Sequence, residues 1–247
     1  MSEAVLSGNR LSLGWPEPYE SRGIGRRIEL MESIWPLRGE RLLDLGCGNG
    51  SYTTAMADGF DQIVGVEIEP VRLAEFRAQL QGRTDAGKFK LRQQGGEHLD
   101  DPDGSFDVVT AIEVLEHVDE LEATVRQVAR VLRPGGASLV TVPNRGFPFE
   151  THSFMIRGRE RRSKWFPFVP WVGPLHRRIS TARNFRPGDL RRLILPAGFA
   201  EVGTTYLMPP LERWGPGRHL RGPVERLERT PLRTFGVSVV AAYRRLP

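Results

Sequence analysis

Three glycines separated by single residues follow an acidic residue in the stretch Asp44-Leu45-Gly46-Cys47-Gly48-Asn49-Gly50. Because glycine has no Cβ, such a loop can adopt positive φ angles and bring its N–H groups, and the positive end of a following helix, against a ligand. A dinucleotide fingerprint would place its third glycine where this chain has Ser51, and no Lys-Ser/Thr end of a phosphate loop is present. The spacing therefore predicts a cofactor loop of a different type.

A second acidic residue, Glu67, ends the apolar run Ile63-Val64-Gly65-Val66, 21 residues after Gly46. In a doubly wound nucleotide-binding fold, a carboxylate at this place binds the two hydroxyls of a ribose. Two simpler interpretations stay open. Glu67 could be an acid placed at the N-terminal end of a helix that begins near Pro70, and Asp44 could be a turn residue or a helix cap. An acid at the end of an apolar strand is costly without partners, which favours a role in binding.

Further motifs follow in order: the strand pattern Ser105-Phe106-Asp107-Val108-Val109, the segment Leu115-Glu116-His117-Val118, and the turn Leu132-Arg133-Pro134-Gly135-Gly136. Over residues 40–145 these motifs, with the glycine loop, resemble in order and spacing those of the class I S-adenosylmethionine-dependent methyltransferases. The resemblance is to the branch that methylates quinones and natural products. It implies a transferase with a Rossmann-like fold that uses S-adenosylmethionine to methylate a small molecule. Because no apolar run approaches the roughly 18 residues needed to span a bilayer and residues 1–10 do not have the pattern of a signal peptide, we expect a cytoplasmic protein.

The resemblance also implies which residues bind the cofactor. Glu67 would hold the ribose, Ile68 would pack on the adenine, and His117 would lie beneath the methionine end. Many relatives carry an aspartate that accepts a hydrogen bond from the adenine amino group, but this chain has Gly95 there, so Gly96 and Glu97 are expected to line the adenine. The expected cofactor-binding residues are Asp44, Gly46, Cys47, Gly48, Gly50, Glu67, Ile68, Gly96, Glu97, Ile112, Glu113 and His117.

Histidine side chains are the candidates for catalysis. The sulfonium methyl is already a strong electrophile, so the enzyme mainly aligns the acceptor with the S–CH₃ bond and excludes water. A base is needed only for an acceptor that carries a proton at neutral pH. The candidates are His152, which follows the fifth strand where the acceptor should enter, and His117, which could instead shape the methionine pocket or cap a helix. Because no His, Cys, Asp and Glu set stands at metal-binding spacing, no metal is predicted.

The net charge of +5 is concentrated in residues 144–187, which hold ten Arg or Lys against two Glu, a local charge of +8. The same segment holds eight Phe and Trp residues, which disordered linkers lack. We interpret the segment as a lid over the acceptor site. Its apolar run, which includes Trp165 and Trp171, covers an apolar ligand or touches a membrane surface, and its Arg residues meet anionic groups.

Alternating strand and helix patterns predict an α/β fold, a doubly wound, mostly parallel seven-stranded sheet with an antiparallel last strand and a helical or loop insertion after the fifth strand. We expect one domain over 1–247: an arm and helix (1–36), a cofactor-binding core (37–143), the lid (144–187), and a C-terminal helix with closing strands (188–247). Predicted strands cover 41–45, 62–67, 88–93, 106–112, 137–142, 199–207 and 235–243. Predicted helices cover 22–35, 51–58, 70–81, 119–132 and 188–195.

Three functions compete. A small-molecule methyltransferase is favoured, acting on an apolar or aromatic acceptor at O, N or C. An RNA or protein methyltransferase is the alternative, in which the basic segment would bind phosphates. Enzymes that methylate the exocyclic amino groups of bases carry an N-P-P-Y type tetrapeptide after the fourth strand. This chain has Ile112-Glu113-Val114-Leu115 there, which argues against that class of acceptor. A dinucleotide oxidoreductase or a non-catalytic partner protein is third, and Ser51 argues against the oxidoreductase. The sequence leaves the oligomeric state open.

Overall fold

The computed structural model describes residues 22–156, 159–162, 167–209, 226–228 and 230–247. The arm predicted at the beginning of residues 1–36, Trp165, and residues 210–225 of the predicted C-terminal region lie outside these residues. Among the helices that are described, none combines the length and the apolar character needed to cross a membrane.

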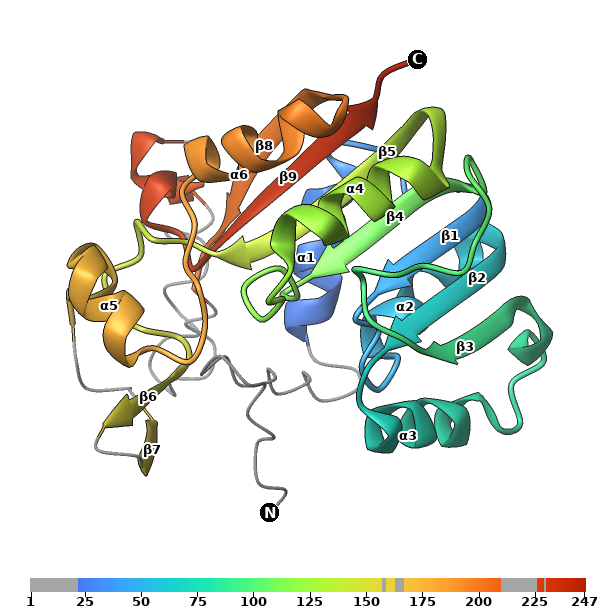
Figure 1. Ribbon diagram of the computed structural model, residues 1–247, viewed down its shortest axis with the longest axis horizontal. Helices are drawn as coiled ribbons and strands as arrows, with labels where there is room; N and C mark the ends of the chain where they lie inside the picture. Colours follow the sequence, from blue (N-terminus) through green and yellow to red (C-terminus); the bar gives the residue numbers. More distant parts are fainter. Residues whose placement is uncertain (1–21, 157–158, 163–166, 210–225, 229) are drawn as a thin grey trace.

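The core is a seven-stranded sheet in the order β3-β2-β1-β4-β5-β9-β8 (Figure 1). Strands β1 to β5 pair in parallel, and β9 runs antiparallel between β5 and β8. This confirms the predicted doubly wound sheet with an antiparallel last strand. The strands are β1 (Gly39–Leu45), β2 (Phe60–Glu67), β3 (Phe89–Gln93), β4 (Phe106–Ile112), β5 (Leu132–Pro143), β8 (Phe199–Leu207) and β9 (Ser238–Arg245).

Helices cover both faces of the sheet, with α4 and α6 on one face and α1 on the other (Figure 1). Successive strand residues point to opposite faces, so Leu43 joins the core beneath α4 and α6, whereas Leu42 joins the core beneath α1. Burial on both faces explains why the parallel strands read as continuous apolar runs. The helices of the sheet are α1 (Arg22–Glu32), α2 (Ser51–Ala55), α3 (Pro70–Leu80), α4 (Leu121–Val131) and α6 (Pro187–Ile194).

Several element boundaries differ from the prediction, among them those of α1, α2, α4, β5 and β9. Helix α1 ends at Glu32 instead of continuing to Trp35, and the Ser33 hydroxyl donates to the Leu30 carbonyl at 2.7 Å, a local bond that competes with helix continuation. The turn predicted at Leu132 to Gly136 is instead a bulged start of β5. Phe106 of β4 pairs with Leu132 and Val108 with Ala137, so the extra residues loop out of the ladder.

The insertion after β5 contains more regular structure than the sequence predicted. Besides a helix, α5 (Gly173–Ile179), it holds a hairpin of β6 (Ser153–Ile156) and β7 (Arg159–Arg162). Short strands without alternation give little signal in a sequence. The insertion lies beyond the carboxyl ends of β4 and β5 (Figure 1). It returns to the core at Phe185, whose N–H donates to the Pro143 carbonyl at 3.0 Å.

One buried carboxylate, that of Asp44, ties three elements together. Its two oxygens accept hydrogen bonds from the hydroxyls of Thr53 in α2, at 2.5 Å, and Thr110 in β4, at 2.7 Å. Burial raises the pKa of Asp44 to about 6, even though both hydrogen bonds lower it. The folded protein therefore binds this proton more tightly than the unfolded chain does.

Because the pKa of Asp44 is raised in the folded state, its contribution to the free energy of unfolding should fall as pH rises from about 4 to above 6, by about 2–3 kcal/mol. Asp44→Asn keeps a hydrogen-bonding group of the same shape and removes the titration. Urea unfolding at about pH 4.5 and about pH 7.5 should show a smaller loss of stability for Asp44→Asn than for the wild type. Equal losses in the two proteins would contradict the assignment.

Candidate active site

The glycine loop leaves the carboxyl end of β1 with all three glycines in the left-handed region, at φ values of 68°, 54° and 86° for Gly46, Gly48 and Gly50. A Cβ at Gly46 would collide with Val114, and one at Gly50 with the ring of Phe76. Among the described residues, none lies within 4 Å of a Cβ added at Gly48. Gly46 and Gly50 are therefore required by packing, whereas the described residues leave open space beside the backbone of Gly48.

The carboxylate of Glu67 holds this loop in place. One of its oxygens, Oε2, accepts from the Gly48 N–H at 3.0 Å, and Oε1 accepts from the N–H groups of Ile68 at 2.9 Å and Glu69 at 3.0 Å. Each carboxylate oxygen has two acceptor sites, so Oε2 retains capacity for another donor. Glu67 thus links the loops after β1 and β2, and it offers an acceptor beside the open space at Gly48.

The expected adenine-binding residues lie around the end of β3. Ile68 exposes 47% of its surface, which is unusual for a large apolar side chain that follows a buried strand. Gly96 is packed so closely that an added Cβ would lie 2.8 Å from the Thr124 methyl group. Glu97 is exposed. Ile68 and Glu97 are thus exposed side chains after β2 and β3, and Gly96 between them in the chain is closely packed.

Other expected cofactor residues are interior. Ile112 is buried in the core beneath α1. Cys47 is buried against α3, and burial raises the pKa of its thiol well above the ordinary value, with the charges of Asp44 and Glu67 adding to the shift. A thiol that stays protonated is a poor nucleophile, so Cys47 acts here as a small packing residue.

Glu113 has a strained backbone at the carboxyl end of β4. Its φ is 54°, in the left-handed region that non-glycine residues rarely adopt. Its carboxylate Oε1 lies 3.2 Å from both the Arg27 guanidinium and the Thr141 hydroxyl. The burial of Arg27 of α1 beside this acid was not predicted, because helical spacing does not show which arginine turns inward.

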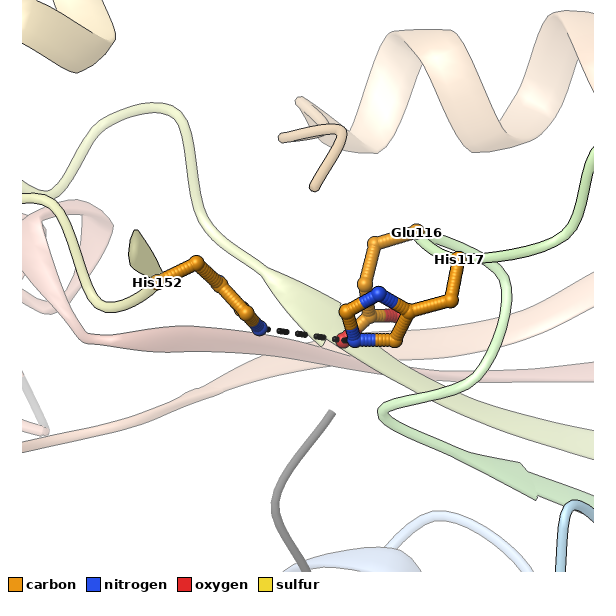
Figure 2. Close-up of side chains that lie close together, drawn as sticks. All are labelled: Glu116, His117 and His152. Carbon is orange, nitrogen blue, oxygen red and sulfur yellow. Dashed lines mark ion pairs between the residues drawn. The ribbon is translucent and has the colours of Figure 1, made fainter. Parts of the chain in front are cut away.

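Glu116, His117 and His152 come together at the junction of the core and the insertion (Figure 2). The Nε2 atoms of His117 and His152 each lie 3.9 Å from Glu116 Oε1, and the two rings are 5.2 Å apart between centroids. Glu116 is fully buried, and burial raises the pKa of its carboxyl well above the ordinary range, with the Glu113 charge adding to the shift. The structure thus brings both predicted catalytic histidines into one cluster.

The insertion adds a carboxylate that sequence reasoning missed. Glu150 Oε2 lies 2.6 Å from His176 Nε2, and Glu150 Oε1 lies 3.7 Å from His152 Nδ1. Burial alone would raise the pKa of Glu150, but hydrogen bonds with His152 and His176 outweigh it and hold the pKa at about 2. Glu150 is therefore ionised at neutral pH. His176 is 26 residues beyond Glu150, so only the fold of the insertion makes this pair recognisable.

The cluster offers two kinds of chemistry. An imidazole next to an ionised carboxylate can accept a proton from an acceptor hydroxyl. The carboxylate of Glu116 and one nitrogen from each of His117 and His152 also lie within 4.8 Å of one another, and these are donor types that a divalent ion uses. The sequence predicted no metal because His152 is 35 residues from His117.

The two glycines Gly48 and Gly50 provide a matched test of the loop. An alanine at either position carries the strain of a positive φ, about 1 kcal/mol, but only Gly50→Ala also collides with Phe76. We expect Gly50→Ala to lower the urea midpoint markedly more than Gly48→Ala. Calorimetry with S-adenosylhomocysteine measures the affinity of both variants. Relative to its loss of stability, Gly48→Ala should lose more affinity than Gly50→Ala. Unchanged affinity in Gly48→Ala would contradict a ligand at Gly48.

Comparison with known proteins shows what this part of the chain is similar to. Residues 43–140 match the family model described as Methyltransferase domain. A ubiquinone biosynthesis O-methyltransferase of Xanthomonas oryzae pv. oryzae (strain PXO99A) is 35% identical over 48% of this chain and 49% of its own length. The chain thus spans about half the length of this relative.

Solved structures share the fold. An S-adenosylmethionine-dependent methyltransferase from Mesorhizobium loti superimposes with a TM-score of 0.61 at 19% identity, over 88% of this chain and 96% of its own. The [4+2]-cyclase SpnF also has a TM-score of 0.61, at 21% identity over 92% and 86%. A fold shared with a cyclase does not by itself fix a reaction. The motifs in residues 43–140 are similar to those of methyltransferase domains, and the fold is the one found in S-adenosylmethionine-dependent methyltransferases of known structure.

Proposed function

We propose that the chain transfers the methyl group of S-adenosylmethionine to a small, apolar or aromatic acceptor at O, N or C. The open space at Gly48 carries this proposal, because the cofactor-binding edge there combines a free backbone approach, the Glu67 carboxylate and the exposed face of Ile68. When bound, S-adenosylmethionine supplies an electrophilic methyl group. In this proposal Glu67 binds the ribose hydroxyls, Ile68 packs on the adenine, and Gly96 and Glu97 line its edge.

The insertion supports an apolar acceptor. Exposed rings gather on it and on the segment before β9: Phe168 and Trp171 have centroids 4.9 Å apart, and Trp171 and Phe235 6.4 Å apart. Exposed aromatic groups of this kind suit an apolar ligand or a membrane surface that holds one. The relative named as a ubiquinone biosynthesis O-methyltransferase supports the same class of acceptor.

His152 stands where it can act on the acceptor. It lies between the insertion and the segment after β4, with Glu150 on its Nδ1 side and Glu116 on its Nε2 side. An ionised Glu150 favours a proton on Nδ1, which leaves Nε2 able to accept one from an acceptor hydroxyl. We propose His152 as the base or acceptor ligand, and His117 as a residue that shapes the methionine end of the site.

The test is methyl transfer itself. The full chain, incubated with methyl-labelled S-adenosylmethionine and a set of phenols and catechols with and without an apolar tail, should yield label that extracts into organic solvent. Glu67→Gln should reduce affinity for S-adenosylhomocysteine about 10- to 100-fold, the loss of a charge-assisted hydrogen bond of about 1.5–3 kcal/mol. Glu75→Gln, on the exposed side of α3, is the matched control and should leave affinity unchanged. Tight binding of NAD without binding of S-adenosylhomocysteine would refute the proposal.

The nucleic-acid alternative makes a separate prediction. Part of the basic charge of the insertion is used internally, since the Arg183 guanidinium donates to the backbone carbonyls of Val118 and Asp119. We therefore expect weak binding of random RNA, with no effect of Trp171→Ala. Filter binding across a salt series measures this. Tight binding with a steep salt slope, lost in the double variant Arg177→Gln and Arg178→Gln, would favour RNA as the acceptor.

A further inference from the structure

We infer that a cavity at the amino ends of β4 and β5 binds a small organic phosphate through Arg126 and Arg245, beside the charge of Arg130. The cavity lies at the end of the sheet opposite the glycine loop, on the side where β9 ends and where Figure 1 marks the C-terminus. The inference does not depend on the proposed methyl transfer, because the cofactor edge shares no residue with this cavity.

The cavity has room for a small molecule with an apolar body. Its walls come from the loop before β4, the last turns of α4, the bulged start of β5, the turn before β8 and the end of β9. Its volume is about 550 Å³, within the range of roughly 300–1,000 Å³ that is usual for small-molecule sites. The apolar part of the lining comes from Ala129, Leu132, Pro134 and Ala197.

The charged part of the lining is mostly arginine. Arg126, Arg130 and Arg245 line the cavity, and among the described residues Asp103 is the acid that lines it with them. Three positive charges and one negative charge leave a net charge of +2. Asp103 is already paired, because its Oδ1 lies 2.8 Å from the Arg130 guanidinium. An anion that enters the cavity therefore meets a favourable potential.

Two of these arginines are held in place by backbone carbonyls. The Arg130 guanidinium donates to the carbonyls of Leu99 at 2.6 Å and Asp101 at 2.7 Å. Nη1 of Arg245 donates to the Gly198 carbonyl at 3.3 Å, and a Cβ at Gly198 would collide with this nitrogen. Both positive charges are thus positioned before a ligand arrives, which reduces the entropy cost of binding.

The third arginine, Arg126, has a free guanidinium. It is exposed, and no hydrogen bond or ion pair joins its side chain to any other residue in the described part of the chain. Arg126 lies four residues before Arg130 on α4, so the two side chains share one face of the helix, and like charges at this spacing repel. A bound anion would relieve that repulsion and give Arg126 a partner.

The donors indicate the class of ligand. A guanidinium group presents its N–H donors in a planar fork that matches the oxygens of a phosphate group. Nε of Arg245 has no hydrogen-bond partner within the described residues, so this guanidinium retains unused donors in addition to those of Arg126. A phosphate monoester carries close to two negative charges at neutral pH, which balances the net charge of the cavity. Its organic body would lie on the apolar part of the lining.

The test is calorimetry of the full chain with phenyl phosphate as the probe. We expect one binding event, with higher affinity than for inorganic phosphate or phenol. Arg126→Gln and Arg245→Gln should each weaken binding at least about tenfold, because each removes a charge-assisted hydrogen bond. Arg77→Gln, which removes an exposed arginine of α3 outside the cavity, is the matched control and should bind like the wild type.

The insertion supplies a second control, because its arginines are another place where an anion can bind. The double variant Arg177→Gln and Arg178→Gln should bind phenyl phosphate with unchanged affinity. Circular dichroism and S-adenosylhomocysteine binding show whether each variant is folded.

Three results would overturn the inference: no binding by the wild type, wild-type affinity in the folded Arg126→Gln and Arg245→Gln variants, or loss of binding in the insertion double variant alone. Equal affinity for inorganic phosphate would overturn the assignment of an organic ligand. S-adenosylhomocysteine binding without phenyl phosphate binding would reject this cavity and leave the proposed function standing. The reverse result would reject the proposed function alone.

Discussion

The hydrogen bonds of the Glu67 carboxylate define the cofactor edge of this protein. They reach the loop after β1 at Gly48 and the start of the next helical segment at Ile68 and Glu69. Parallel strands end at one edge, so two loops that would otherwise move independently share one buried acceptor there. The open space at Gly48 and the exposed face of Ile68 keep their relative positions only while this carboxylate holds both loops.

The same edge concentrates negative charge, and the fold balances it with groups from distant parts of the chain. The Asp44 carboxylate accepts hydrogen bonds from two hydroxyls. Glu113 pairs with the Arg27 guanidinium from α1, and Glu150 pairs with His176 from α5. Glu116 has an imidazole nitrogen of His117 and one of His152 at 3.9 Å from its carboxylate. Helix α1 and the insertion therefore do more than cover the sheet, because each brings a cation or an imidazole to an acid that would otherwise be costly to bury.

The sequence predicted best where local signals are strong. The strands at Phe106 to Ile112 and at Phe199 to Leu207 have the predicted bounds. The first is a buried, mostly apolar run, and the second begins directly after the Ala197-Gly198 turn. Gly46, Gly48 and Gly50 were predicted to adopt positive φ, and all three do. The β6–β7 hairpin was missed, as was the Glu150–His176 pair, because both depend on contacts within the insertion that no periodicity shows. The burial of Arg27 was missed for the same reason.

The direction of β9 has a practical consequence. Ser238 pairs opposite Pro143 at the carboxyl end of β5, and Arg244 pairs opposite Ala137 near its beginning. The strand therefore leads the chain away from the cofactor loop and the insertion, and in Figure 1 the C-terminal mark lies at the opposite side from α5. A tether attached behind Pro247 would hold the molecule to a sensor surface with its binding edge turned toward the solution.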